Sequence, residues 1–349
     1  MKILRVAAIS VFIAIVGALA NAGSSPAIAF GEDSIYIVLS YDENDLCGKP
    51  QLQGILQGIN EGPNRHFPVK TFYLDSKRLS KSQVEQKVQQ VLHSIKRGHP
   101  RVVVTVDDAA FLYVGLALNG QPNTFVVFSG INGDISAYNK ISPFLQDRNP
   151  ISNITGVVEH LFLKEQVDFL KLLHKWPCEM GILYSTDFMG EKGKKQIGRS
   201  LQSVMPKKNL RYFPVSTLSE LKIRTKQINE SPAICAYIPL VLSIRDEKNG
   251  RQITLEDLVP QITQRIKKID IAVNKTFTKA GFFGGANVDM FHMGYQAGQM
   301  VSMLLDGVEI NKLQVEKASR FQVIVNKNRA KELGLKLEPD VLCLVDELI

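Results

Sequence analysis

The sequence has few of the residue patterns that build metal or nucleophilic centres. Its six histidines show no metal-ligand spacing, and no catalytic triad pattern is found. No Gly-x-Gly-x-x-Gly follows the first predicted strand, and residues 190–195 lack both the spacing and the hydroxyl residue of a phosphate-binding loop. We therefore predict no catalytic residue, no metal site and no cofactor, and expect that the protein is not an enzyme.

Long apolar runs and concentrated charge are also scarce. Beyond residue 19 the apolar segments are short and interrupted by charged residues, so no membrane-spanning segment is expected there. The formal net charge is +8, but the basic residues are scattered. The densest cluster, Lys192, Lys194 and Lys195, is typical of an exposed helix start. We expect no nucleic-acid partner.

The N-terminus has the pattern of a secretory signal peptide. Lys2 and Arg5 precede an apolar run at residues 6–19, and small residues follow at 20–22. We predict that residues 1–22 are removed, with residue 29 as an alternative end, which lowers the net charge to +6. An uncleaved anchor is the competing interpretation, but the run is shorter than the roughly 20 residues that span a bilayer. The mature protein is expected to be periplasmic, without stable membrane insertion.

Only four cysteines are present, so at most two disulfides can form within the chain. An oxidising compartment permits such bridges, and three pairings of two bonds are possible. Cys178 lies just ahead of a predicted strand and Cys235 lies inside a neighbouring one. We predict a Cys178–Cys235 bond if any forms, with a buried free thiol at Cys235 as the alternative.

The mature chain of about 320 residues alternates short β-branched runs with amphipathic helical patterns. This alternation is typical of parallel sheets covered by helices, and the length favours two α/β lobes, each Rossmann-like. Strands are predicted at residues 35–39, 69–74, 102–106, 124–128, 180–184, 210–215, 233–238, 280–284 and 321–325. Helices are predicted around residues 55–59, 80–98, 163–170, 190–201, 220–228, 255–266, 293–304 and 328–333.

Ligands of open parallel sheets bind beyond the carboxyl ends of the strands. Aromatic, hydroxyl and carboxylate residues gather at these predicted ends, which suits a small polar molecule with an ammonium-like group. Capping of the following helices is the alternative role for each residue. The adjacent Asp107 and Asp108 exceed what one cap requires. The candidate ligand-binding residues are Ser40, Tyr41, Asp42, Asp107, Asp108, Ala109, Ser129, Gly130, Ser185, Thr186, Asp187, Tyr237, Asn287 and Asp289.

Several motifs together resemble the periplasmic substrate-binding proteins of ABC importers, in the branch that includes tryptophan and tyrosine binders. Asn-Ile-Thr-Gly-Val at residues 153–157 resembles the crossover between the two lobes of that family. Residues 294–297 and 304–307 resemble one of its helices, and Val-Ile-Val-Asn at 323–326 resembles its closing pattern. Residues 129–132 depart from the Asp-Pro that members often carry there, and Gly284 and Gly285 replace a Gly-Ala pair.

The resemblance implies a type I periplasmic-binding-protein fold with a multi-strand hinge. Lobe 1 would comprise residues 31–155 with about 286–318, and lobe 2 residues 156–285 with about 319–349. It also implies a monomer that captures an amino-acid-like or amine-bearing ligand between the lobes and delivers it to an ABC permease. A ligand-sensing subunit that docks on a membrane sensor kinase or cyclase is the alternative.

Overall fold

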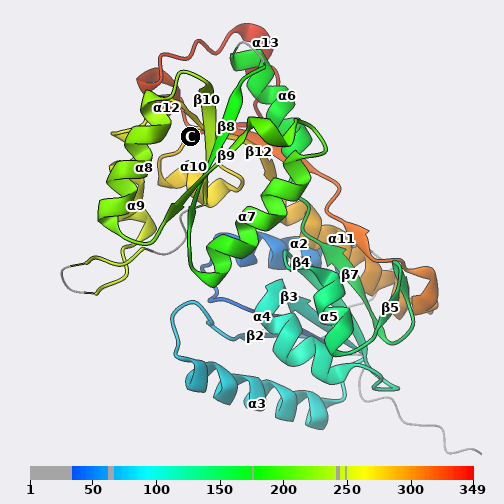
Figure 1. Cartoon of the computed structure of the whole chain (residues 1–349). Helices are drawn as coiled ribbons and strands as arrows, with labels where there is room; N and C mark the ends of the chain where they lie inside the picture. The colour runs from blue at the N-terminus through cyan, green and yellow to red at the C-terminus, as the bar shows by residue number, and fades with distance from the viewer. Residues whose placement is uncertain (1–33, 62–66, 175–176, 241–243, 248–249) are drawn as a thin grey trace, which may run out of the picture.

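The computed structural model describes residues 34–61, 67–174, 177–240, 244–247 and 250–349. The predicted signal peptide lies outside these residues. The chain has the predicted α/β fold class, with two lobes whose parallel sheets are flanked by helices (Figure 1). In the described part of the chain, no helix is both long and apolar enough to cross a bilayer.

Lobe 1 is built on a six-stranded parallel sheet in the order β13-β7-β4-β3-β1-β2. Helices α2 and α11 pack on one face of this sheet and share one hydrophobic cluster. Helix α3 packs on the other face over a second cluster. The strands are β1 (Ile35–Leu39), β2 (Val69–Tyr73), β3 (Val102–Val106), β4 (Phe125–Ile131), β7 (Ile154–Val158) and β13 (Glu316–Lys317). The helices are α2 (Gly48–Asn60), α3 (Lys81–Gly98), α4 (Asp107–Ala110), α5 (Ile135–Ile141) and α11 (Met290–Leu305), and a short hairpin is formed by β5 (Leu145–Gln146) and β6 (Asn149–Pro150).

Lobe 2 is built on a four-stranded parallel sheet in the order β11-β10-β8-β9. Helices α6 and α7 cover one face, and α8, α9 and α10 cover the other. The strands are β8 (Glu179–Ser185), β9 (Leu210–Val215), β10 (Ile234–Leu240) and β11 (Ile269–Asp270). The helices are α6 (Leu163–Leu173), α7 (Phe188–Leu201), α8 (Leu218–Glu230), α9 (Leu255–Thr263), α10 (Lys275–Ala280), α12 (Lys327–Glu332) and α13 (Pro339–Leu342).

Three segments connect the lobes, after β7, along β12 (Gly284–Val288), and before β14 (Phe321–Val325). Strands β12 and β14 pair antiparallel, and β14 pairs with β15 (Glu347–Leu348). Strand β12 serves both lobes, because its Ala286 and Val288 join a lobe 1 cluster while the preceding Phe283 joins a lobe 2 cluster. Strand β7 continues in the lobe 1 sheet to Val158, beyond the boundary that we expected at residue 155.

Most predicted elements are confirmed, and the strands 35–39, 102–106, 210–215 and 321–325 have the predicted bounds. The strand predicted at 280–284 is wrong, because Ala280 ends helix α10 and β12 begins only at Gly284. Helix α10 was not predicted. Its N-cap residue is Asn274, whose side chain accepts a hydrogen bond from the Phe277 amide. The short strand β11 was not predicted.

The predicted disulfide is confirmed. Cys178 and Cys235 are bonded, with their Cα atoms 5.9 Å apart. The bond joins the segment before β8 to its neighbour β10, across 57 residues of sequence. It lies at the amino ends of these strands, opposite the end at which a ligand of a parallel sheet binds.

Candidate functional site

A cavity of about 460 Å³ lies between the lobes at the carboxyl ends of their parallel strands. Small-molecule sites in proteins typically measure roughly 300–1,000 Å³, so its size suits one small ligand. Both lobes contribute to its wall, and so does the connection after β7. The two lobes provide different chemistry.

The lobe 1 side is polar because the loop after each of five neighbouring strands contributes one polar side chain. These residues are Tyr41 after β1, Lys77 after β2, Asp107 after β3, Asn132 after β4 and Glu159 after β7. Since parallel strands end at the same edge of a sheet, residues far apart in sequence are brought together here.

Asp107 is the most deeply placed of these groups, with only 4% of its surface exposed. Its backbone has a φ of 67°, a left-handed conformation that costs energy for a residue other than glycine. The Gln51 side chain donates to Asp107 Oδ2 over a long 3.4 Å, and Gln51 is itself held by Ser129 Oγ at 2.8 Å. Burial raises the pKa of Asp107 well above its usual range, and the nearby Glu159 and Asp108 raise it further.

Glu159 shares this environment. Burial raises its pKa to about 7, Asp108 adds to the rise, and a hydrogen bond with Asn132 opposes it. The pKa of the Tyr41 phenol is raised by burial and by Asp107, so its hydroxyl stays neutral and can donate to a ligand. The lobe 1 side therefore carries carboxyl groups whose ionisation is held back by burial and by each other.

The cavity also contains two lysines, and each lies beside a carboxylate. Lys77 Nζ is 2.5 Å from Asp45 and 3.7 Å from the centre of the Tyr41 ring. Lys192 Nζ, from α7 of lobe 2, is 3.9 Å from Asp108 Oδ1 of lobe 1. This second pair joins the lobes across the cavity, and so does the 3.9 Å contact of Cys47 Sγ with Thr276 Oγ1.

The lobe 2 side is mostly apolar. Helices α7, α9 and α10 and the end of β10 contribute aliphatic and aromatic side chains to the lining, while Lys192, Gln196, Asn274 and Thr276 add polar groups. The apolar residues are Ile197, Leu240, Ile253, Leu255, Leu258, Val273 and Phe277. The cavity can therefore hold a molecule whose cationic end faces lobe 1 and whose apolar body faces lobe 2.

Of the residues predicted at the lobe 1 strand ends, Tyr41 and Asp107 line the cavity. Asp108 is not in the lining, but its Oδ1 is 3.9 Å from Nζ of the lining residue Lys192. The other predicted residues lie outside the lining, and several stabilise the surrounding backbone. Ser40 Oγ donates to Val106 O at 2.7 Å and accepts from the Ala110 amide at 2.8 Å. The residues outside the lining are Ser40, Asp42, Ala109, Ser129 and Gly130.

The residues predicted at the lobe 2 strand ends lie outside the cavity lining. Asp187 caps α7 by accepting from the Gly190 amide at 2.9 Å, and Ser185 donates to Asp187. Asp289 caps α11 in the same way. Both aspartates therefore have the capping role that was the alternative to ligand binding. Thr186 bonds with Ser216, and the Asn287 amide donates to Gly285 O within β12.

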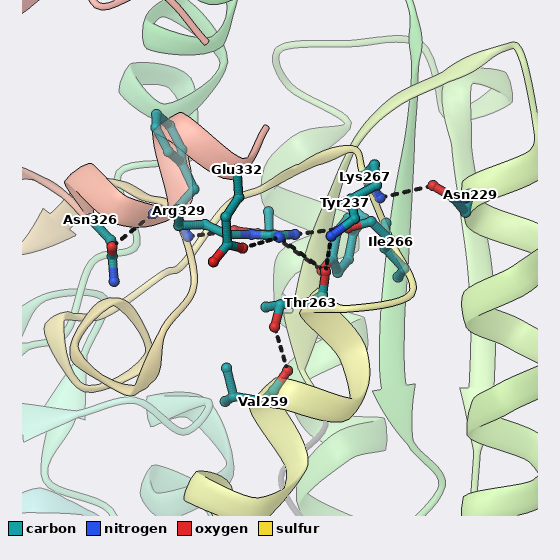
Figure 2. Close-up of polar contacts among 11 residues, drawn as sticks. Asn229, Tyr237, Val259, Thr263, Ile266, Lys267, Asn326, Arg329 and Glu332 are labelled. Carbon is teal, nitrogen blue, oxygen red and sulfur yellow. Dashed lines mark hydrogen bonds and ion pairs between the residues drawn. The ribbon is translucent and has the colours of Figure 1, made fainter. Parts of the chain in front are cut away.

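Tyr237 lies in the middle of β10 and is completely buried. Its hydroxyl is 3.4 Å from Asp270, a carboxylate that also receives two hydrogen bonds from Arg329. Figure 2 shows Arg329 at the centre of this buried network, donating as well to the carbonyls of Thr263 and Ile266. The network fastens α12 to the lobe 2 sheet, so Tyr237 is part of the core.

Strand length explains these differences in placement. Strand β4 extends three residues beyond its predicted end, which places Ser129 in the sheet, and β10 extends two, which places Tyr237 in the middle of the strand rather than near its end. Lys77, Glu159 and Lys192 were not predicted as lining residues. Glu159 could have been found if β7 had been recognised as a strand, since the β-branched pattern at 154–158 precedes it directly.

The chain is similar in sequence to a family of substrate-binding proteins and in fold to solved structures. A family described as ABC transporter substrate binding protein matches residues 48–349. A tyrosine-binding protein of Clostridioides difficile strain R20291 is 21% identical over 194 residues. That match covers 55% of this chain and 53% of the relative, so the chain spans about half of that relative's length.

Solved structures agree on the fold. The ABC domain of a Streptococcus pneumonia protein in complex with L-Trp superposes with a TM-score of 0.64 at 19% identity, covering 91% of this chain and 100% of the other. A ligand-free, open substrate binding protein with adhesive properties from Clostridium difficile gives a TM-score of 0.70 at 12% identity, covering 90% and 98%.

Proposed function

This chain belongs to the family of ABC transporter substrate-binding proteins, and on that premise we propose that it captures a small amine-bearing or amino-acid-like solute between its lobes and delivers it to an ABC permease. The observation that carries the proposal is the cavity of about 460 Å³ at the carboxyl ends of both sheets. Its carboxyl groups on one side and apolar residues on the other fit a cation with an organic body.

We further propose that residues 34–61, 67–158 and 289–318 move as lobe 1, and that most of the remaining described residues move as lobe 2. The three connections after β7, along β12 and before β14 would form the hinge. A ligand that touches both lobes favours the closed arrangement, because only that arrangement provides all of its contacts. We also propose that the protein works outside the cytoplasm, where the predicted signal peptide would direct it.

A thermal-shift screen of the mature chain against amino acids, amines, nucleosides and small carboxylates tests the capture. A ligand at 100 times its dissociation constant should stabilise the protein by about 2.7 kcal/mol. Absence of any shift across these classes would contradict the proposal.

The membrane partner is tested separately with the ligand found in that screen. Stimulated ATP hydrolysis by the reconstituted transporter supports delivery. If the liganded protein instead binds only a sensor kinase or cyclase, the sensing role replaces delivery.

A further inference from the structure

The cavity has more carboxyl groups than ammonium groups around it. Among the described residues that line it or directly contact its lining, the carboxyls are those of Asp45, Asp107, Asp108 and Glu159, and the ammonium groups are those of Lys77 and Lys192. Lys77 is held by Asp45, and Lys192 lies beside Asp108. Among the described residues, Asp107 and Glu159 are then the two of these carboxyls that form no ion pair, although the charge of Lys77 partly offsets the rise in the pKa of Asp107.

We propose that this cavity selects organic amines that lack a carboxylate over the matching α-amino acids. The inference rests on the capture function proposed above and specifies the class of its ligand. The amine would lie against Asp107 and Glu159, and its apolar body would lie against the lobe 2 residues, among them Leu258 and Phe277.

The state of Asp107 supports this placement. The carboxyl is almost fully buried, yet in the described part of the chain its side-chain donor is Gln51 at 3.4 Å, longer than a usual hydrogen bond. A buried carboxylate is costly unless it is paired and hydrogen-bonded. An ammonium group from the ligand would supply the missing charge and up to three donors.

A ligand carboxylate would have no comparable place. It would bring a fifth acidic group into a partly enclosed space, where charges interact more strongly than in water. The two lysines already neighbour carboxylates, and Lys77 is also held against the Tyr41 ring. An α-amino acid would have to displace one of these pairings, whereas an amine would leave both intact.

Proton linkage gives a second line of support. Burial and neighbouring acids hold the pKa values of Asp107 and Glu159 above their usual range, and the pKa of Glu159 is about 7, so part of the population carries a proton on Glu159 at neutral pH. A bound cation favours the ionised form, and amine affinity should therefore rise with pH between 5 and about 7. The other titratable groups around these carboxyls are Asp108, Asp45, Lys77, Lys192, Tyr41 and Cys47. The pKa values of Tyr41 and Cys47 are raised, so both keep their protons in this range.

The test compares tyramine, L-tyrosinamide and L-tyrosine by isothermal titration calorimetry of the mature chain at pH 7.5. The amide has the size of the amino acid without its negative charge, so it separates charge from bulk. We expect tyramine and L-tyrosinamide, which lack the carboxylate, each to bind at least about tenfold more tightly than L-tyrosine. Tryptamine and L-tryptophan form a second matched pair.

Two variants locate the effect. Asp107→Asn should weaken tyramine binding by roughly tenfold or more, while the ligand-free melting curve shows that the protein still folds. Asp108→Asn removes the carboxylate beside Lys192 and should narrow the preference for tyramine over tyrosine. The matched control is Glu309→Gln, because Glu309 is exposed, lies beside Lys312 and is outside the cavity lining; this change should alter neither affinity.

The outcomes separate this inference from the capture function. Equal or tighter binding of the amino acids overturns the amine preference and leaves capture supported. Binding of another class only, such as nucleosides, does the same. If no compound of the full screen binds, the capture function itself fails.

Discussion

Two buried aspartates, one in each lobe, have opposite surroundings. Asp270 in lobe 2 is fully buried and accepts hydrogen bonds from Arg329, Tyr237 and the Phe283 amide. Asp107 in lobe 1 is 4% exposed, lines the cavity and has one long hydrogen bond from Gln51. Both follow or end a parallel strand, so strand position alone does not distinguish them.

The difference shows how a structural carboxylate can be told from one available to a ligand. A buried polar group whose partners all come from the protein stabilises the fold. A buried carboxyl that opens on a cavity and lacks a cationic partner destabilises the ligand-free protein and can gain energy from a ligand. Substitutions around the two aspartates should therefore have effects of opposite sign.

The largest effect is expected for Arg329→Met. This change leaves Asp270 buried without its charge partner, and removal of one member of a buried pair typically costs about 3–5 kcal/mol. Chemical denaturation of the ligand-free protein measures the loss. Arg211→Met is the matched control, because Arg211 pairs with Glu179 at the surface and should cost less than about 1 kcal/mol. Equal losses in the two variants would contradict the role of the buried pair.

A smaller effect with the opposite sign is expected for Glu159→Gln. The folded protein holds the Glu159 proton more tightly than the unfolded chain, since the pKa is about 7 rather than 4.5. Stability of the ligand-free protein therefore falls as the pH rises through this window, and the glutamine removes that loss. After allowance for solvent screening of this half-buried group, we expect a gain of about 1–2 kcal/mol at pH 8.

Denaturation at pH 5 provides the comparison for this prediction. Glu159 is mostly protonated there in the folded protein, so the gain should become small. A gain that is independent of pH would show that packing, rather than ionisation, causes the change.

The smallest effect is expected for Asp187→Ala. This variant tests whether Asp187 only caps a helix or also contacts the ligand. Loss of the cap on α7 should destabilise the protein by about 1 kcal/mol. Ligand affinity should remain that of the unchanged protein, because Asp187 lies outside the cavity lining. Melting and titration of the same sample measure both quantities. A tenfold loss of affinity would instead place Asp187 in the site.

Local sequence signals predicted the frame of the site better than its residues. The strand 102–106 was predicted with its observed bounds, and Asp107 directly follows it at the cavity. Tyr237 was expected near the end of a strand at 233–238, but β10 continues through Pro239 to Leu240 and Tyr237 is buried in its middle. Lys192 was interpreted as part of an exposed helix start, but in the structure it lines the cavity and approaches Asp108 of the other lobe.

The sequence by itself determined the two α/β units and the polar ends of the early strands. These features can be predicted because hydrophobic periodicity and the order of the elements are read from residues that are close together in the sequence. It also carried the pairing of Cys178 with Cys235, since neighbouring strands bring these residues together. Only the tertiary structure decided which carboxyls are satisfied and which face the cavity. That outcome depends on partners such as Arg329 and Lys192, which lie far away in sequence and meet their aspartates only when the sheets and lobes assemble.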